Sequence, residues 1–135
     1  MRFMMLMIPG GYESATPDTM PSAEAVKAMM KYTEDLKRAG VLLALDGLHP
    51  PSAGARVNFK TGKPIVIDGP FTEAKEVVGG YWMIDVRSRE EAIEWARRCP
   101  ASSKDVIEVR RVQEMSDFPE DVRKAAEGFD ELKAR

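Results

Sequence analysis

Three patterns in this chain of 135 residues predict a single α+β domain. Short apolar or alternating segments have the length and period of β-strands, and two longer segments repeat apolar residues at helical spacing. Glycine and proline turns separate these segments. Once a predicted hairpin is set aside, the segments follow the order strand, helix, strand, strand, helix, strand. A chain of this length buries a hydrophobic core without the help of disulfides or metals.

The first strand and the first helix are predicted in residues 3–40. Residues 3–8 form a continuous apolar run, which is typical of a central strand. Residues 9–21 contain two glycines and three prolines, and loops of about this length are usually functional lids or loosely ordered segments. Ser22 is a suitable N-cap for the helix, and Gly40 supplies its C-terminal stop. The residues that recur at helical spacing between them are Val26, Met29, Met30, Thr33 and Leu36.

The middle of the chain predicts a second strand followed by a hairpin. Residues 41–48 are mainly apolar and end at a stiff His-Pro-Pro turn. Polar and apolar residues alternate through residues 56–60, which is the period of a half-exposed strand. A turn that contains Gly62 and a short apolar strand at residues 65–67 complete the predicted hairpin.

The last third of the chain predicts a strand, a helix, a strand and a terminal helix. Residues 81–86 form the first of these strands. Ser88 begins a capping box that opens the helix, and residues 106–112 alternate as the last strand. A C-terminal helix is expected from about Pro119, weakened by Gly128. The expected buried stripe of the earlier helix consists of Ala92, Trp95, Ala96 and Cys99.

This order of elements is the ferredoxin-like βαββαβ pattern, with an inserted β-hairpin and a C-terminal helix. In that pattern an antiparallel sheet carries both helices on one face. The other face would leave apolar side chains in water, so we expect a cover from a second subunit, the C-terminal helix or both. We therefore expect a homodimer.

The composition argues against several classes of function and location. The formal net charge is −2, and acidic and basic residues are interspersed, so no nucleic-acid-binding surface is expected. No segment approaches the roughly 18 apolar residues of a membrane span. The apolar start ends at Pro9 without the cleavage pattern of a signal peptide. Cys99 is the single cysteine, which favours a reducing compartment, and we expect a cytoplasmic protein.

The most informative motif lies in residues 68–81. Its residues are Asp68, Gly69, Pro70 and Phe71, then Glu73, Lys75 and Glu76, and then Gly79, Gly80 and Tyr81. This motif resembles the signature of the YCII-related proteins of the DGPF type. The resemblance extends over residues 1 to about 115, from the opening strand through the Gly-Leu-His-Pro-Pro turn to the last strand. Residues 1–115 are therefore expected to form the YCII-related domain, and residues 116–135 a C-terminal helical extension packed on it.

The resemblance implies a dimeric α/β-barrel fold, in agreement with the order of strands. Some members of the family occur beside or fused to extracytoplasmic-function sigma factors. Some related YCII proteins carry a His–Asp pair that is proposed to be catalytic. The position of His49 varies in the DGPF type and does not match the histidine of that pair. The resemblance therefore assigns no catalytic role to His49.

The geometry of the predicted hairpin indicates one candidate catalytic pair, Asp68 and His49. If the turn is centred on Thr61 and Gly62, residues near Ala55 lie across from those near Asp68, and the loop of residues 48–54 emerges at the same end. A carboxylate that accepts a hydrogen bond from an imidazole raises its basicity and leaves the other ring nitrogen for proton transfer. Structural roles are the alternatives, because aspartate before Gly-Pro readily forms a turn and histidine is common in surface loops.

Four further residues are candidates for substrate binding. Arg56 and Lys75 would hold a substrate carboxylate, Phe71 would line a pocket, and Tyr12 would fold over it as a lid. Each also has a plain structural reading, such as a surface ion pair of Lys75 worth under about 1 kcal/mol or a core plug at Phe71. The many methionines are either core filler or the wall of an adaptable pocket.

One histidine and one cysteine do not make a zinc site, and no phosphate-binding glycine motif is present, so neither metal nor cofactor is expected. Cys99 is expected to be an inert core thiol.

We expect a small-molecule enzyme of the isomerase or lyase type that acts by acid–base proton transfer. One alternative is a non-enzymatic module that binds a ligand or partner and regulates transcription through a sigma factor. Another is a scaffold with a vestigial cleft.

Overall fold

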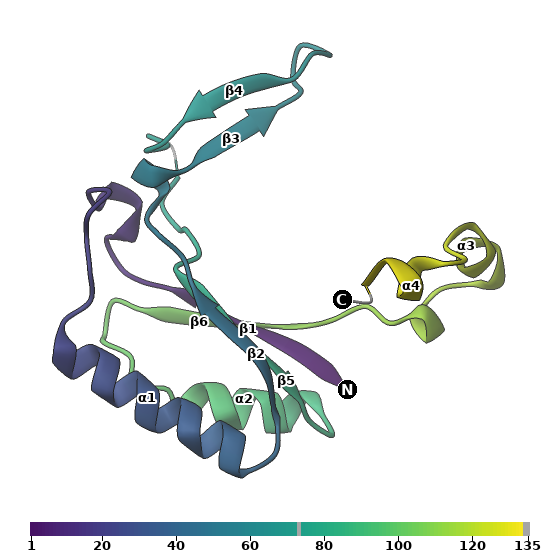
Figure 1. Ribbon diagram of the computed structural model, residues 1–135, viewed down its shortest axis with the longest axis horizontal. Coiled ribbons are helices and arrows are strands. Elements are labelled where there is room, and N and C mark those ends of the chain that lie inside the picture. Colours follow the sequence, from purple (N-terminus) through teal and green to yellow (C-terminus); the bar gives the residue numbers. More distant parts are fainter. Residues whose placement is uncertain (73, 134–135) are drawn as a thin grey trace.

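A computed structural model describes residues 1–72 and 74–133 (Figure 1). Glu73 of the signature, and Ala134 and Arg135 at the end of the expected extension, lie outside the described residues. The strands are β1 (Arg2–Ile8), β2 (Leu42–Gly47), β3 (Ala55–Asn58), β4 (Ile65–Asp68), β5 (Gly80–Asp85) and β6 (Val106–Arg111). The α-helices are α1 (Ala23–Arg38), α2 (Arg89–Arg97), α3 (Glu120–Ala125) and α4 (Phe129–Lys133).

The main sheet contains β2, β5, β1 and β6 in that order, and each neighbouring pair is antiparallel. The longer helices α1 and α2 lie together on one face of this sheet (Figure 1). Strands β3 and β4 form a separate two-stranded sheet. The predicted ferredoxin-like α+β fold with an inserted hairpin is therefore confirmed.

The hydrophobic core lies between the main sheet and these two helices. Successive residues of β1 alternate between buried and half-buried, so that Phe3, Met5 and Met7 face the helices. The Tyr32 ring of α1 meets the Trp82 ring of β5 edge to face, with centroids 5.4 Å apart. The Tyr32 hydroxyl donates a hydrogen bond of 2.7 Å to the carbonyl of Trp95 in α2. One aromatic side chain thus joins both helices to the sheet.

The ends of the two long helices follow the local sequence signals. The Ser22 hydroxyl accepts a hydrogen bond from the Ala25 N–H and caps α1, and Gly40 follows that helix with a φ of 75°. The Ser88 hydroxyl accepts from the Glu91 N–H in the same way at the start of α2. In the described part of the chain, no helix combines the length and the apolar character that a membrane span requires.

The β3–β4 hairpin has the predicted register and stands apart from the main sheet (Figure 1). Ala55 is paired with Asp68, as expected from a turn at Gly62. The peptide bond between Gly69 and Pro70, directly after β4, is cis.

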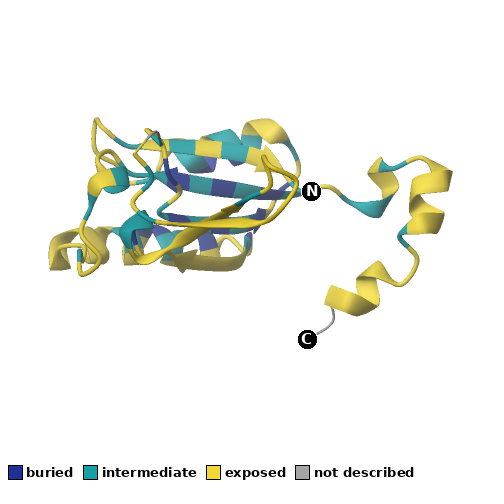
Figure 2. Ribbon diagram, turned by 90° about the horizontal axis from the view of Figure 1, so that it is seen from above, coloured by how far each residue is buried: buried dark blue, intermediate teal, exposed yellow. Residues whose placement is uncertain are grey.

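The C-terminal segment forms two short helices in place of the single expected helix. Gly128 lies between α3 and α4 with a φ of 86°, a left-handed conformation that interrupts a helix. Figure 2 shows the segment standing beyond the end of the sheet, and no described residue of α3 or α4 is buried. Within the described single chain, this segment does not lie over the open face of the sheet, which leaves a second subunit as the other expected cover.

Candidate functional site

A cavity of about 380 Å³ lies between α1 and the edge of the main sheet formed by β2 and β5. Apolar side chains from the helix and the strands form most of its wall: Met7, Val26, Met29, Met30, Leu45 and Trp82. Three of these residues, Val26, Met30 and Leu45, are exposed in the single chain, so the cavity opens to solvent. Its size and its apolar lining are those of a small-molecule site.

A second cavity of about 490 Å³ adjoins the first at the end of β2. The two cavities share Pro9, Pro21, Gly47 and Gly79, so they adjoin, and they are treated together below as the two parts of one cleft. The second part is lined by Tyr12, Leu48 and His49 as well as the first loop. Two of the predicted site residues, Tyr12 and His49, are therefore together in the cleft.

Tyr12 fastens the long first loop across the cleft. Its hydroxyl donates a hydrogen bond of 2.5 Å to the carbonyl of Leu48, next to His49. Burial of the Tyr12 hydroxyl raises its pKa, so the group stays protonated and able to donate. A Cβ atom at Gly79 would lie 2.6 Å from Cγ of Pro9 and 3.4 Å from the Tyr12 ring, so the loop sits directly on the start of β5.

His49 has an exposed side chain on a backbone that is held at both sides. The N–H of Leu48 donates to the carbonyl of Gly79 over 2.9 Å, and Pro50 is fully buried. The imidazole is thus presented at the rim of the cleft by a rigid turn. Among the described residues, no hydrogen bond joins His49 to Asp68 or to another carboxylate.

The Asp68 turn packs against the same loop but lies outside the cleft. The Gly69 N–H donates to the carbonyl of Gly54 over 2.9 Å. A Cβ atom at Gly69 would lie 1.7 Å from the carbonyl oxygen of Pro51, which explains why glycine follows Asp68. Asp68 itself is exposed, and among the described residues it belongs to the lining of neither part of the cleft.

The other predicted binding residues lie near the base of the hairpin or beyond it. The Arg56 guanidinium lies 4.0 Å above the centre of the Phe71 ring, the geometry of a cation–π contact. Lys75 is exposed at a bend between Phe71 and β5. None of these three residues lines the described cleft, so the structure separates them from Tyr12 and His49.

Asp46 and Tyr81 border the cleft, and their side chains form a polar pair on the open face of the sheet, which the sequence did not single out. They are paired across β2 and β5, and the Tyr81 hydroxyl donates to the Asp46 carboxylate over 3.0 Å. This hydrogen bond and the charge of Asp46 raise the pKa of Tyr81. The available signal was an aspartate in an otherwise apolar strand, but its partner depends on the register between strands.

The described residues offer no metal site and no activated thiol. No group of three or more His, Cys, Asp or Glu side chains gathers in the described chain in a way that would hold a metal ion. Burial, followed by the charge of Asp105, raises the pKa of Cys99 to about 11. A thiol with so high a pKa is a poor nucleophile near neutral pH. The cleft therefore depends on its apolar wall and on the polar groups at its rim.

Comparison with known proteins finds a family model and a relative that match this chain. A family model described as the YCII-related domain matches residues 1–116. The chain is also 42% identical over 67 residues to "Uncharacterized protein R00369" of Rhizobium meliloti (strain 1021). That match covers 50% of this chain and 51% of the relative, so the chain spans about half the length of the curated relative that it matches.

Proposed function

The chain belongs to the YCII-related domain family, and from this premise we propose that it binds a small, largely apolar molecule in the two-part cleft. We further propose that it acts on this molecule by acid–base proton transfer, as isomerases and lyases do. The observation that carries the proposal is the adjacency of an apolar cavity to a second cavity lined by His49 and Tyr12.

The apolar part of the cleft suits the body of the ligand. Methionine side chains are unbranched and polarizable, so Met29 and Met30 adapt to ligands of different shape. The volume of about 380 Å³ lies within the range of about 300–1,000 Å³ for small-molecule sites. A planar or short aliphatic group fits this lining better than a sugar or a nucleotide, which would leave many polar groups without partners.

The polar rim suits the reacting end of the ligand. Imidazole groups accept and donate protons near neutral pH, and His49 is the single histidine of the chain. The Tyr12 hydroxyl lies on the same part of the cleft as a hydrogen-bond donor. In this proposal Asp68 acts through the turn that supports the His49 loop, because its carboxylate lies outside the cleft.

A ligand screen with two matched variants tests the binding part of the proposal. Ala25 of α1 lines the apolar cavity and Ala28, one turn further, does not, so Ala25→Phe fills the cavity while Ala28→Phe adds the same ring outside it. Small apolar carboxylates and aromatic metabolites are screened by thermal shift, since a ligand raises the midpoint by binding the folded state. A ligand that stabilises the wild type and Ala28→Phe but not Ala25→Phe supports the cleft. Equal stabilisation of all three proteins contradicts it.

The catalytic part is tested separately with the ligand found in that screen. His49→Gln is expected to keep the binding shift and to lose turnover, because the amide fills similar space but transfers no proton at neutral pH. Turnover that is unchanged in His49→Gln would remove the proton-transfer role and leave a binding protein.

We also propose a homodimer through the open face of the main sheet, which is the face away from α1 and α2. Met4, Leu6, Tyr81 and Met83 lie on this face and are only half-buried in the single chain. The apolar side chains of this face lie beside the charged Glu108 and Arg110, and a second copy of the chain would take them out of water. Sedimentation analysis is expected to give a mass of two chains, and a monomer at micromolar concentration would contradict this proposal.

A further inference from the structure

The β3–β4 hairpin exposes apolar side chains on both of its faces. In its register Val57 lies opposite Val66 on one face, and Ile65 and Ile67 belong to the other face. All four are exposed, with Val66 at 66%, and Phe59 beside the turn is 67% exposed. A two-stranded hairpin is at best marginally stable alone in water. Its exposed apolar side chains are therefore typical of a surface that binds another part of a protein.

The described part of the C-terminal extension, residues 116–133, also exposes apolar side chains. Val122, Phe129 and Leu132 are exposed at 40%, 47% and 81%. Helices α3 and α4 contain six and five residues, and helices this short are unstable in water without packing. Their exposed apolar residues therefore also need a partner.

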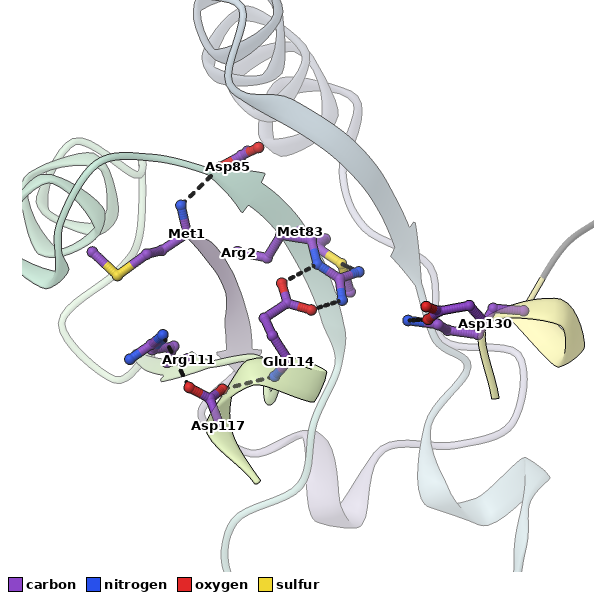
Figure 3. Close-up of polar contacts among 9 residues, drawn as sticks. Met1, Arg2, Met83, Asp85, Arg111, Glu114, Asp117 and Asp130 are labelled. Carbon is purple, nitrogen blue, oxygen red and sulfur yellow. Dashed lines mark hydrogen bonds and ion pairs between the residues drawn. The ribbon is translucent and has the colours of Figure 1, made fainter. Parts of the chain in front are cut away.

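Two ion pairs hold the beginning of the extension and the residues just before it at one end of the main sheet (Figure 3). Glu114 binds the guanidinium of Arg2, and Asp117 binds that of Arg111. The extension thus leaves the sheet where β1 begins and β6 ends. The hairpin leaves the opposite end, where β2 ends and β5 begins (Figure 1).

The hairpin and the two short helices carry opposite net charge. Residues 55–68 of the hairpin contain three basic residues and one acidic residue. Residues 120–133 contain five acidic and three basic residues. Within the described chain, Lys60 and Lys63 of the hairpin and Asp121 and Glu127 of the extension have no ion-pair partner. Charges of this arrangement orient two surfaces as they approach.

We propose that the extension of one subunit packs on the β3–β4 hairpin of a second copy of this chain, and that the contact is reciprocal. The inference rests on the proposed homodimer and adds a second contact region to it. A two-fold axis perpendicular to the strands brings opposite ends of the two sheets together, and with them each hairpin and its partner's extension. Val57 and Val66 then pack against Val122, Phe129 and Leu132, while the lysines of the hairpin face the acidic residues.

The contact between the extension and the hairpin also stabilises the loop at the rim of the cleft. The base of the hairpin is joined to the His49 loop, because the Gly69 N–H binds the carbonyl of Gly54. A partner that holds the hairpin therefore holds the loop that carries His49. In this arrangement each subunit stabilises the polar rim of the other subunit's cleft.

Cross-linking between engineered cysteines tests the contact. In a Cys99→Ser background, chains with Val66→Cys are mixed with chains with Phe129→Cys and treated with a short bismaleimide. A covalent dimer is expected in the mixture, at a yield at least several times that of either variant alone. The matched control pairs Phe129→Cys with Met20→Cys, which is 65% exposed in the first loop and lies outside β3 and β4. That control mixture is expected to remain uncross-linked.

The other results overturn the inference in distinguishable ways. A chain that carries both cysteines and closes only an internal cross-link indicates that the extension folds back on its own hairpin. A dimer by sedimentation that gives no cross-link keeps the sheet-to-sheet dimer and removes the contact proposed here. A monomer by sedimentation removes both.

A charge-swap series tests the chemistry of the contact in the full chain. Lys60→Glu with Lys63→Glu is expected to raise the dimer dissociation constant about tenfold, because two favourable charge contacts become unfavourable. Asp121→Lys with Glu127→Lys, combined with the first pair, is expected to restore most of the affinity. The control, Lys27→Glu with Lys31→Glu on α1, makes the same change in net charge and is expected to leave the constant unchanged. Equal effects of the hairpin pair and the α1 pair would overturn the inference.

Discussion

The Glu114 carboxylate binds the Arg2 guanidinium through two hydrogen bonds, 2.8 Å to Nε and 2.6 Å to Nη2 (Figure 3). The two residues are 112 positions apart, and they tie the end of the domain to its first strand. The hydrogen bond and the charge of Arg2 lower the pKa of Glu114, and Glu114 in turn raises the pKa of Arg2. The pair therefore favours the ionised carboxylate in the folded chain.

The first prediction concerns the pH dependence of this pair. Because the folded pKa of Glu114 is below its unfolded value, the pair contributes stability above the ordinary glutamate range and loses it as pH falls through the folded pKa. Glu114→Gln is expected to lower the unfolding midpoint at pH 7, and its effect is expected to shrink as the pH falls and the carboxylate of the wild type is protonated. Denaturant titrations of both proteins at pH 7, 5 and 3 measure this. If the difference in free energy of unfolding between the two proteins stays constant with pH, the charge of Glu114 does not contribute to stability.

The second prediction concerns Gly69 in the signature turn. Its added Cβ would lie 1.7 Å from the Pro51 carbonyl oxygen, so Gly69→Ala must displace the turn from the loop of residues 51–54. We expect a loss of about 3 kcal/mol in the free energy of unfolding, or local opening of the hairpin base, seen as faster hydrogen exchange. The control is Gly54→Ala, whose Cβ would meet the nearest atom at an ordinary 3.6 Å. A Gly69→Ala protein as stable as Gly54→Ala would disprove the packing described here.

The third prediction concerns the hydrogen bond from the Tyr12 hydroxyl to the Leu48 carbonyl, which holds the first loop. Tyr12→Phe removes the donor to the Leu48 carbonyl while it keeps the ring beside Gly79. Since net hydrogen bonds are worth about 1 kcal/mol, ligand affinity is expected to fall about fivefold as the first loop loosens. Ser14→Ala serves as the control, because in the described part of the chain its hydroxyl donates to the nearby Gly11 carbonyl and not across the cleft. Calorimetry with a ligand from the screen compares the affinities of the three proteins. Identical affinities would show that the hydrogen bond from Tyr12 to Leu48 does not shape the cleft.

The fourth prediction concerns the reactivity of Cys99. With its pKa raised to about 11, the thiol is expected to react with iodoacetamide at pH 8 at least tenfold more slowly in the native chain than in urea. In the native protein the rate is expected to rise about tenfold for each pH unit up to 10, as the thiolate fraction grows. Mass spectrometry of timed aliquots measures both rates. Fast alkylation of the native chain at pH 8 would show that the thiol is accessible and activated.

The helix boundaries could be predicted because their causes lie within a few residues of each other. Ser22 and Ser88 accept hydrogen bonds from N–H groups three residues ahead, and Gly40 adopts its left-handed conformation by itself. The hairpin register follows in the same way from its turn, and Ala55 is paired with Asp68 as expected. The division of the C-terminal segment into two helices also has a local cause, Gly128, whose effect was underestimated.

The candidate site was predicted only in part, because its members depend on contacts between distant residues. Tyr12 and His49 come together through the bond from Tyr12 to Leu48, 36 positions away. Asp68 lies beside the same loop, yet its side chain is exposed outside the cleft. The pairing of Asp46 with Tyr81 depends on the register of two strands that are not consecutive in the chain.

By itself the sequence determined the α+β class, the order of the strands and helices, and the family, since short-range patterns and a local signature carry them. Only the tertiary structure decided where the cleft lies, which predicted residues it contains and where the extension leaves the sheet. The physical reason is the range of the interactions. Hydrogen bonds within a turn are encoded by neighbouring residues, whereas a cavity exists only where α1, β2 and the first loop meet without filling the space between them.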